Sequence, residues 1–203
     1  MSVLKTIRHS LNLTATVLAA IALTGCASLS GGSSTVGSEH DNRTLGEARP
    51  LKEKLVTLAP TVREEDAEAV ANCAYRYSRQ LAHEYHAVRP AIFHNFLVNV
   101  GIKKRGLCYQ WTEDLLAQLQ TLNVSTLELR WGMARAGTLR EHNSVVVTAC
   151  GQPFEQGIVL DPWRRSGRLV WKPVVEDKYP WVEGELVPFA DATGTAAQLV
   201  KQK

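Results

Sequence analysis

The sequence predicts an α+β domain, in which helices come first and an antiparallel sheet follows. Two observations support this prediction. Apolar residues recur at helical spacing from about residue 63 to residue 122, and short runs rich in β-branched residues follow from about residue 125 to residue 171. About 180 residues remain after a predicted export signal, which is enough for one domain with a hydrophobic core.

Three helices are expected in the first half of this domain. They run from Arg63 to about His86, from Ala91 to about Val100, and from Cys108 to about Leu122. Thr61 can cap the first helix, and the acidic residues at 64–66 favour its start through the helix dipole. Its buried face is expected to contain Ala67, Val70, Ala74, Tyr77, Leu81 and Tyr85.

Four strands are expected in the second half. The predicted ranges are Ser125–Met133, Asn143–Ala149, Gly157–Asp161 and Arg168–Trp171. The second range is the strongest, because it is short and rich in β-branched residues. Turns containing Gly and Pro separate the later ranges, which favours antiparallel neighbours.

The N-terminus resembles that of an exported bacterial lipoprotein. Lys5 and Arg8 precede an apolar, uncharged stretch, Leu11–Leu23, and the sequence Leu-Thr-Gly-Cys ends at Cys26. That tetrapeptide resembles a lipobox, so residues 1–25 are predicted to be a signal peptide and Cys26 to be lipidated. By the same resemblance, Ala27 indicates the outer membrane, with the protein on its periplasmic face. The alternative is an ordinary signal peptide with an incidental cysteine.

Residues 26–50 are predicted to form a flexible tether, because they begin with a run rich in Ser and Gly, and residues 51–203 are predicted to form the domain. Removal of the signal segment, with its two basic and no acidic residues, lowers the formal charge from +3 to +1. This near-neutral balance gives no indication of nucleic-acid binding.

Three cysteines remain beyond the lipidation site. Cys73, Cys108 and Cys150 are an odd number in an oxidising compartment, so at least one thiol stays free. If Cys108 is the free one, the bridge would join Cys73 and Cys150. The sequence permits any of the three pairings, or none.

Three residues stand where nucleophilic chemistry needs them. Cys108 begins a predicted helix, where unpaired N–H groups and the dipole favour a thiolate and can donate to an oxyanion. His142 opens a predicted strand, and Asp161 ends the next, directly before Pro162. Neighbouring antiparallel strands can place a histidine base beside the carboxylate that orients it.

The same residues carry a family resemblance. Gly106-Leu107-Cys108 at a helix start, His-x-x-Val-x-Val from His142, and Leu-Asp-Pro-Trp around Asp161 resemble the transglutaminase-like superfamily, over about residues 93–171. The resemblance implies a papain-like fold with Cys108 as nucleophile, His142 as general base and acid, and Asp161 as the group that orients it. The chain departs from the family where Asn143 follows the histidine, since an aromatic residue is common soon after it. No side-chain oxyanion donor is evident upstream of the cysteine.

The expected function is that of a lipid-anchored cysteine acyl-transfer enzyme facing the periplasm. It would hydrolyse amide or isopeptide bonds through a thioester, as a cysteine protease or amidase does, in periplasmic proteins or in peptidoglycan peptides. No cofactor and no metal ion are expected. The alternative is a non-catalytic lipoprotein that uses the same fold to bind a protein or cell-wall partner. A third, weaker hypothesis is a cell-wall peptidase of another papain-like group, because the Asp-Cys-Ser-Gly sequence usual around the cysteine of that group is absent here.

Overall fold

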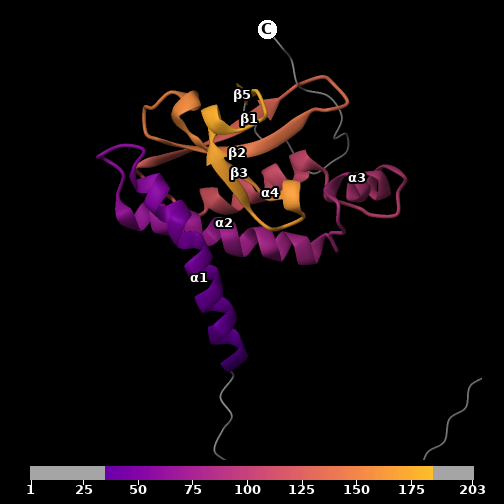
Figure 1. Cartoon of the computed structure of the whole chain (residues 1–203), viewed down its shortest axis with the longest axis horizontal. Helices are drawn as coiled ribbons and strands as arrows, with labels where there is room; N and C mark the ends of the chain where they lie inside the picture. Colours follow the sequence, from indigo (N-terminus) through magenta and orange to yellow (C-terminus); the bar gives the residue numbers. More distant parts are fainter. Residues whose placement is uncertain (1–34, 185–203) are drawn as a thin grey trace, which may run out of the picture. The chain divides into compact units, whose positions relative to one another are not determined.

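The computed structural model describes residues 35–184, with side chains from residue 46 onward (Figure 1). The predicted signal peptide, the lipidation site Cys26 and the first part of the predicted tether lie outside the described residues, as does the C-terminal tail. Within the described part of the chain, four α-helices and a five-stranded antiparallel sheet form an α+β fold. The predicted fold class is therefore confirmed at this level.

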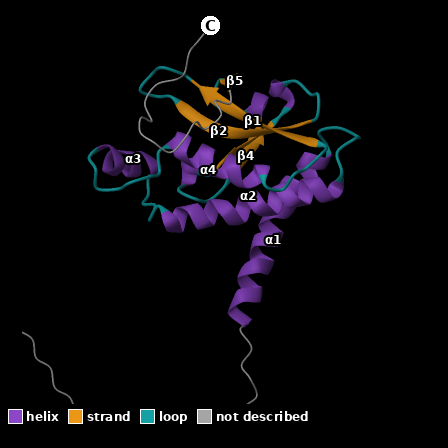
Figure 2. Cartoon of the chain, turned by 180° about the vertical axis from the view of Figure 1, so that it is seen from behind, coloured by secondary structure: helices purple, strands orange, loops and turns teal. Residues whose placement is uncertain are grey.

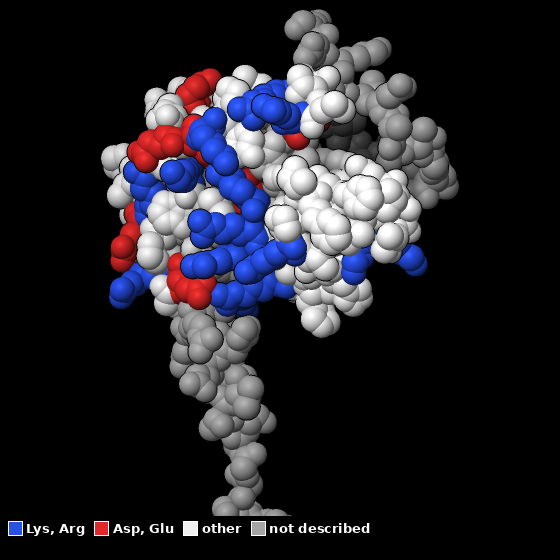
Figure 3. Space-filling model, turned by 45° about the vertical axis from the view of Figure 1, so that its right-hand side comes forward, with Lys and Arg blue, Asp and Glu red and all other residues white. Residues whose placement is uncertain are grey.

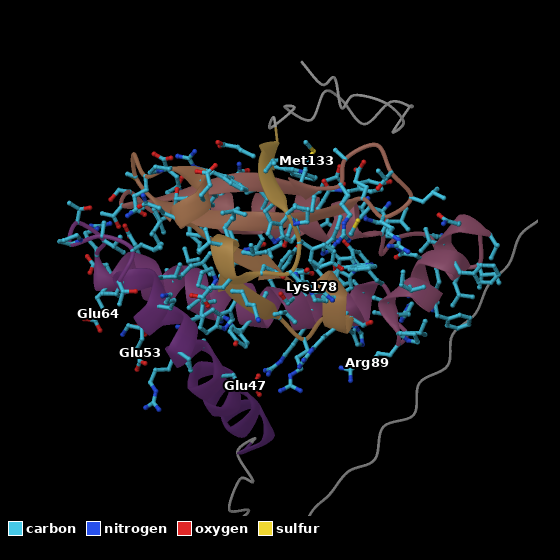
Figure 4. The ribbon with its side chains drawn as sticks, turned by 45° about the horizontal axis from the view of Figure 1, so that its top comes forward. Glu47, Glu53, Glu64, Arg89, Met133 and Lys178 are labelled. Atoms are coloured by element: carbon cyan, nitrogen blue, oxygen red, sulfur yellow. The ribbon has the colours of Figure 1, made fainter. Side chains whose placement is uncertain are left out.

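Helix α1, Thr35–Val56, corrects the predicted tether and the predicted start of the domain at residue 51. Ala48, Leu51 and Leu55 recur at helical spacing, and each is at most 1% exposed. They pack in the main core with α2, so the chain is part of the compact unit from Thr35 onward. Lys52 adds ion pairs from α1 to Glu64 and to a second glutamate of α2; Figure 4 labels Glu64 at the start of that helix.

Helices α2, Glu64–Glu84, and α4, Cys108–Gln120, cover one face of the sheet (Figures 1 and 2). The predicted buried face of α2 is confirmed, with only Tyr77 partly exposed. The predicted cap was wrong, because Thr61 lies in the preceding turn and Arg63 occupies the N-cap position without a side-chain cap. Asp66, in the first turn, instead ties the helix to the sheet by accepting hydrogen bonds from the N–H groups of Ser125 and Thr126.

The strands lie in the order β4-β3-β2-β1-β5. Their bounds are Leu127–Ala134 (β1), His142–Ala149 (β2), Ile158–Asp161 (β3), Val170–Pro173 (β4) and Trp181–Gly184 (β5). Each of the four predicted strands is present, with its ends shifted by a few residues. The sequence analysis did not predict β5, a four-residue strand that pairs with β1 at one edge of the sheet.

Strand β2 lies at the centre of the sheet, and its residues alternate between two buried layers. Val145 and Val147 face the helices and belong to the same core cluster as Leu115 of α4. Val146 faces the other way and packs with Trp181 and the 3-10 turns on that side. This alternation fixes which face of the sheet each side chain of the site occupies.

Helix α3, Ala91–Asn99, packs differently from the other helices. Ile92 is 69% exposed and Phe96 56% exposed, whereas His94 is buried. The helix is therefore anchored by a few polar contacts, and much of its apolar surface faces solvent.

The three cysteines of the described region, Cys73, Cys108 and Cys150, are free thiols. The possible bridge between Cys73 and Cys150 is thus not formed, since Cys73 is buried in the helical core and Cys150 is exposed in the turn after β2. Within residues 35–184, none of the helices combines the length and the hydropathy that crossing a bilayer would require.

Candidate active site

Helix α4 begins at Cys108 because the residues before it are held in place by its own first turn. The side-chain oxygen of Gln110 accepts hydrogen bonds from the N–H groups of Gly106 at 2.8 Å and Leu107 at 3.0 Å. The indole N–H of Trp111 donates to the carbonyl of Gly106 at 3.0 Å. The position of the thiol is therefore fixed by a network that is largely buried.

Gly106 is required at this turn for two reasons. Its φ is +124°, a region that side chains rarely adopt, and a Cβ atom there would lie 2.1 Å from Nε2 of His94. His94 is itself fixed, because its Nδ1 accepts a hydrogen bond from the N–H of Val88 and its Nε2 then donates to the carbonyl of Arg105 at 2.9 Å. The buried histidine of α3 thus packs against the turn that precedes the cysteine.

The sheet brings His142 and Asp161 together. Val145 pairs with Leu160, so His142 and Asp161 lie diagonally across β2 and β3 on the same face. Nε2 of His142 and Oδ2 of Asp161 are 2.6 Å apart, and both side chains are at most 2% exposed. The predicted pair is therefore a buried, close contact on the sheet face opposite α4.

Asp161 is held by a residue whose role the sequence analysis did not predict. The backbone N–H and Nε of Arg164 donate to its two carboxylate oxygens, at 2.9 Å and 3.0 Å. The same guanidinium makes two hydrogen bonds to Asp177, at 2.7 Å and 3.1 Å. The Arg164 side chain is only 14% exposed because it bridges these two carboxylates.

Aromatic rings enclose the imidazole of His142. The ring centroids of Trp163 and Tyr179 each lie 4.7 Å from it, and that of Trp181 lies 5.3 Å away. Trp163 is fixed by its indole N–H, which donates to the side-chain oxygen of Asn95 on α3 at 2.9 Å. These rings help to keep water from the histidine, which is 2% exposed.

The Cys108 thiol is half-buried and lies at the end of β2. Its Sγ is 3.9 Å from the carbonyl oxygen of Glu141 and 3.9 Å from the amide nitrogen of Asn143, the residues on either side of His142. Nε2 of His142 is bonded to Asp161, and Nδ1 is buried with no hydrogen-bond partner among the described residues. Nδ1 is therefore the imidazole nitrogen that remains for the thiol.

The pKa of His142 reflects these neighbours. Burial lowers it, but the hydrogen bond to Asp161 and the adjacent Cys108 thiol together raise the pKa to about 9, from an ordinary 6.5. The imidazole consequently holds its second proton at neutral pH. A protonated imidazole beside a cysteine stabilises the thiolate form of that cysteine.

The first turn of α4 adds its own donors. The backbone N–H groups of Cys108 and Tyr109 stand at the start of the helix, where helical geometry provides no acceptor four residues earlier. The helix dipole also places partial positive charge at this end. Both features favour negative charge on Sγ and on an oxygen bonded next to it.

The surface near α3 combines apolar and basic character. Figure 3, which brings the side carrying α3 forward, shows Lys and Arg gathered in a band beside a broad surface without charged residues. The exposed apolar residues of this region are Ile92, Phe93, Phe96, Val100 and Ile102. Two surface hollows of about 290 Å³ each lie elsewhere, and neither is lined by Cys108, His142 or Asp161.

The structure thus brings the three predicted site residues together: His142 bonds Asp161, and Sγ of Cys108 lies 3.9 Å from atoms of the two residues that flank His142. Sequence reasoning did not predict the roles of Arg164, Asp177 and Tyr179 around them. The only hint of these roles in the sequence is the pair Arg164-Arg165 after Trp163, since a basic residue three positions after a predicted catalytic aspartate can pair with it. No family model matches this chain, and neither does any curated protein or solved structure.

Proposed function

We propose that this chain is a cysteine acyl-transfer enzyme of the transglutaminase-like superfamily, with a papain-like arrangement of its site. It hydrolyses amide or isopeptide bonds through Cys108, His142 and Asp161. One observation supports this most directly: the buried His142 bonds Asp161 through Nε2 and keeps a buried, unpartnered Nδ1, while Sγ of Cys108 lies 3.9 Å from atoms of the residues on either side of His142. A purely structural histidine would more commonly satisfy both ring nitrogens.

The proposed reaction has two steps. The Cys108 thiolate attacks the carbonyl carbon, the C=O electron pair moves to oxygen, and the carbon–nitrogen bond then breaks as protonated His142 gives its proton to the leaving amine. A thioester remains on Sγ. His142 next takes a proton from water, the resulting hydroxide attacks the thioester, and the acid and the thiolate are released. Asp161 holds the imidazole and stabilises its charged form throughout.

The proposed setting follows from the N-terminal sequence. The lipobox-like sequence ending at Cys26 supports anchoring at the outer membrane, facing the periplasm. Substrates within reach of that location are chains that carry amide or isopeptide bonds. Periplasmic proteins and the peptide stems of peptidoglycan are such chains.

The test compares the full-length protein with Cys108→Ala on two substrates, an unfolded protein and a set of cross-linked peptidoglycan peptides. New amines are quantified and products identified by mass spectrometry. Cys150→Ala serves as the matched control, because Cys150 is an exposed free thiol in the turn after β2. Hydrolysis by wild type and Cys150→Ala, with none by a folded Cys108→Ala, is the expected result. Equal activity in Cys108→Ala would refute the proposal.

A second candidate is a non-catalytic lipoprotein that binds a protein or cell-wall partner. The exposed apolar side chains of α3, among them Ile92 and Phe96, favour it, because contiguous exposed apolar surface is typical of binding sites. Partner capture that is retained in Cys108→Ala and lost in Ile92→Ser/Phe96→Ser, in a chain without hydrolytic activity, would favour this candidate over the enzyme.

A further inference from the structure

Asn143 follows His142 in β2, and its side chain therefore points to the opposite face of the sheet. That is the face covered by α4, since Val145 and Val147 on the same side pack with helix residues. Asn143 is 5% exposed. The thiol at the start of α4 therefore lies between two side chains, with His142 on one side of the strand and Asn143 on the other.

The orientation of the Asn143 amide is determined by a tryptophan. The indole Nε1 of Trp131, on β1, can only donate, and it lies 2.8 Å from Oδ1 of Asn143. The NH₂ group must therefore point the other way. Its nitrogen lies 3.2 Å from a carboxylate oxygen of Glu141 and 3.9 Å from Sγ of Cys108, and it donates toward both.

We propose that Asn143 is a catalytic residue whose Nδ2–H, together with the backbone N–H of Cys108, donates to the oxyanion formed during acyl transfer. This inference rests on the proposed function. When the Sγ electron pair forms the bond to carbon, the C=O electron pair moves to oxygen, and that oxygen lies one carbon away from Sγ. A donor 3.9 Å from Sγ can approach this oxygen to hydrogen-bond distance.

Two reagents separate the proposed oxyanion role of Asn143 from any effect of Asn143 on the thiolate. Alkylation by iodoacetamide needs the thiolate but forms no oxyanion, whereas acylation by p-nitrophenyl acetate needs the thiolate and passes through an oxyanion. The ratio of the acylation rate to the alkylation rate at Cys108 therefore measures the contribution of the oxyanion donor alone. Both rates are measured on the full-length protein by peptide mass spectrometry, as the alkylated and the acetylated Cys108 peptide, and the same samples report the rates at Cys150.

In Asn143→Ala, the acylation rate should fall by about 100-fold relative to the alkylation rate, the effect of losing one such donor. A relative fall of less than about tenfold overturns the inference. Failure of the proposed function looks different, because wild-type Cys108 would then react no faster than Cys150 in either assay.

Trp131→Phe provides a second test that keeps the asparagine and removes only the group that orients it. Trp171→Phe is the matched control, because Trp171 lies on β4, outside the site, and its indole N–H donates to the hydroxyl of Tyr75 on α2 at 3.2 Å. The acylation-to-alkylation ratio should fall in Trp131→Phe and stay at the wild-type value in Trp171→Phe. If Asn143→Ala does not fold, an unchanged ratio in Trp131→Phe overturns the inference.

Discussion

Stability should decrease as the pH rises through the range in which His142 loses its proton. The folded pKa of about 9 lies above the ordinary 6.5, so the folded state holds a proton that the unfolded chain has released. The stabilisation is fully present below about pH 6.5 and is lost as the pH passes through about 9. At 1.36 kcal/mol for each pH unit, this difference corresponds to about 3 kcal/mol of unfolding free energy.

Urea unfolding under reducing conditions measures this effect when wild type is compared with His142→Gln, which has no imidazole. Titrating groups that do not contact His142 are common to both proteins and cancel in the difference. The wild-type advantage at about pH 6 should shrink by about 3 kcal/mol at about pH 10. An advantage that stays constant, or that grows with pH, would mean that His142 is buried in its neutral form, and the ion-pair reasoning would be wrong.

Two substitutions test the supports around the site. Arg164→Met should lower the unfolding free energy by about 3 kcal/mol, measured by urea unfolding, because it removes the guanidinium that pairs with the buried carboxylates of both Asp161 and Asp177. Gly106→Ala should also lower it by about 3 kcal/mol, because the new Cβ would collide with the ring of His94 in a backbone region that favours glycine.

Neighbouring residues provide the controls for these two changes. Arg165 is exposed, so Arg165→Met should change the unfolding free energy by less than about 0.5 kcal/mol. Gly137 has φ +74° but open space around it, so Gly137→Ala should lower stability by only about 1 kcal/mol. Losses as large in the controls as in the test variants would contradict the assigned contacts.

The elements that the sequence predicted share strong, uninterrupted patterns. Helix α2 has an apolar residue at nearly every turn, and β2 is a β-branched run short enough to exclude a helix. Helix α1 was missed because Gly46 and Pro50 interrupt its pattern, and its apolar face becomes evident only when α2 packs against it. The four-residue strand β5 carries too few residues to show alternation, and pairing with β1 determines it.

The candidate site likewise contains residues that the sequence could predict and residues that it could not. Cys108, His142 and Asp161 could be predicted, because each stands at the end of an element with a residue type that chemistry uses there. The contacts of Arg164 and Asn143 could not, since they are made with residues distant in sequence. Arg164 bonds Asp177, and its guanidinium lies 4.8 Å from the centroid of the Tyr179 ring. Asn143 is aimed by a tryptophan of the adjacent strand, a contact that register alone creates.

The rate of Cys108 alkylation as a function of pH, in wild type and in His142→Ala, tests the central claim most directly. Peptide mass spectrometry reads the rate at Cys108 and, in the same sample, at the exposed thiol of Cys150. The account predicts fast labelling of Cys108 below about pH 7 that slows in the variant, while Cys150 is unaffected. A Cys108 rate that rises only near pH 8.5 in both proteins, as for a free cysteine, would contradict a thiolate paired with His142.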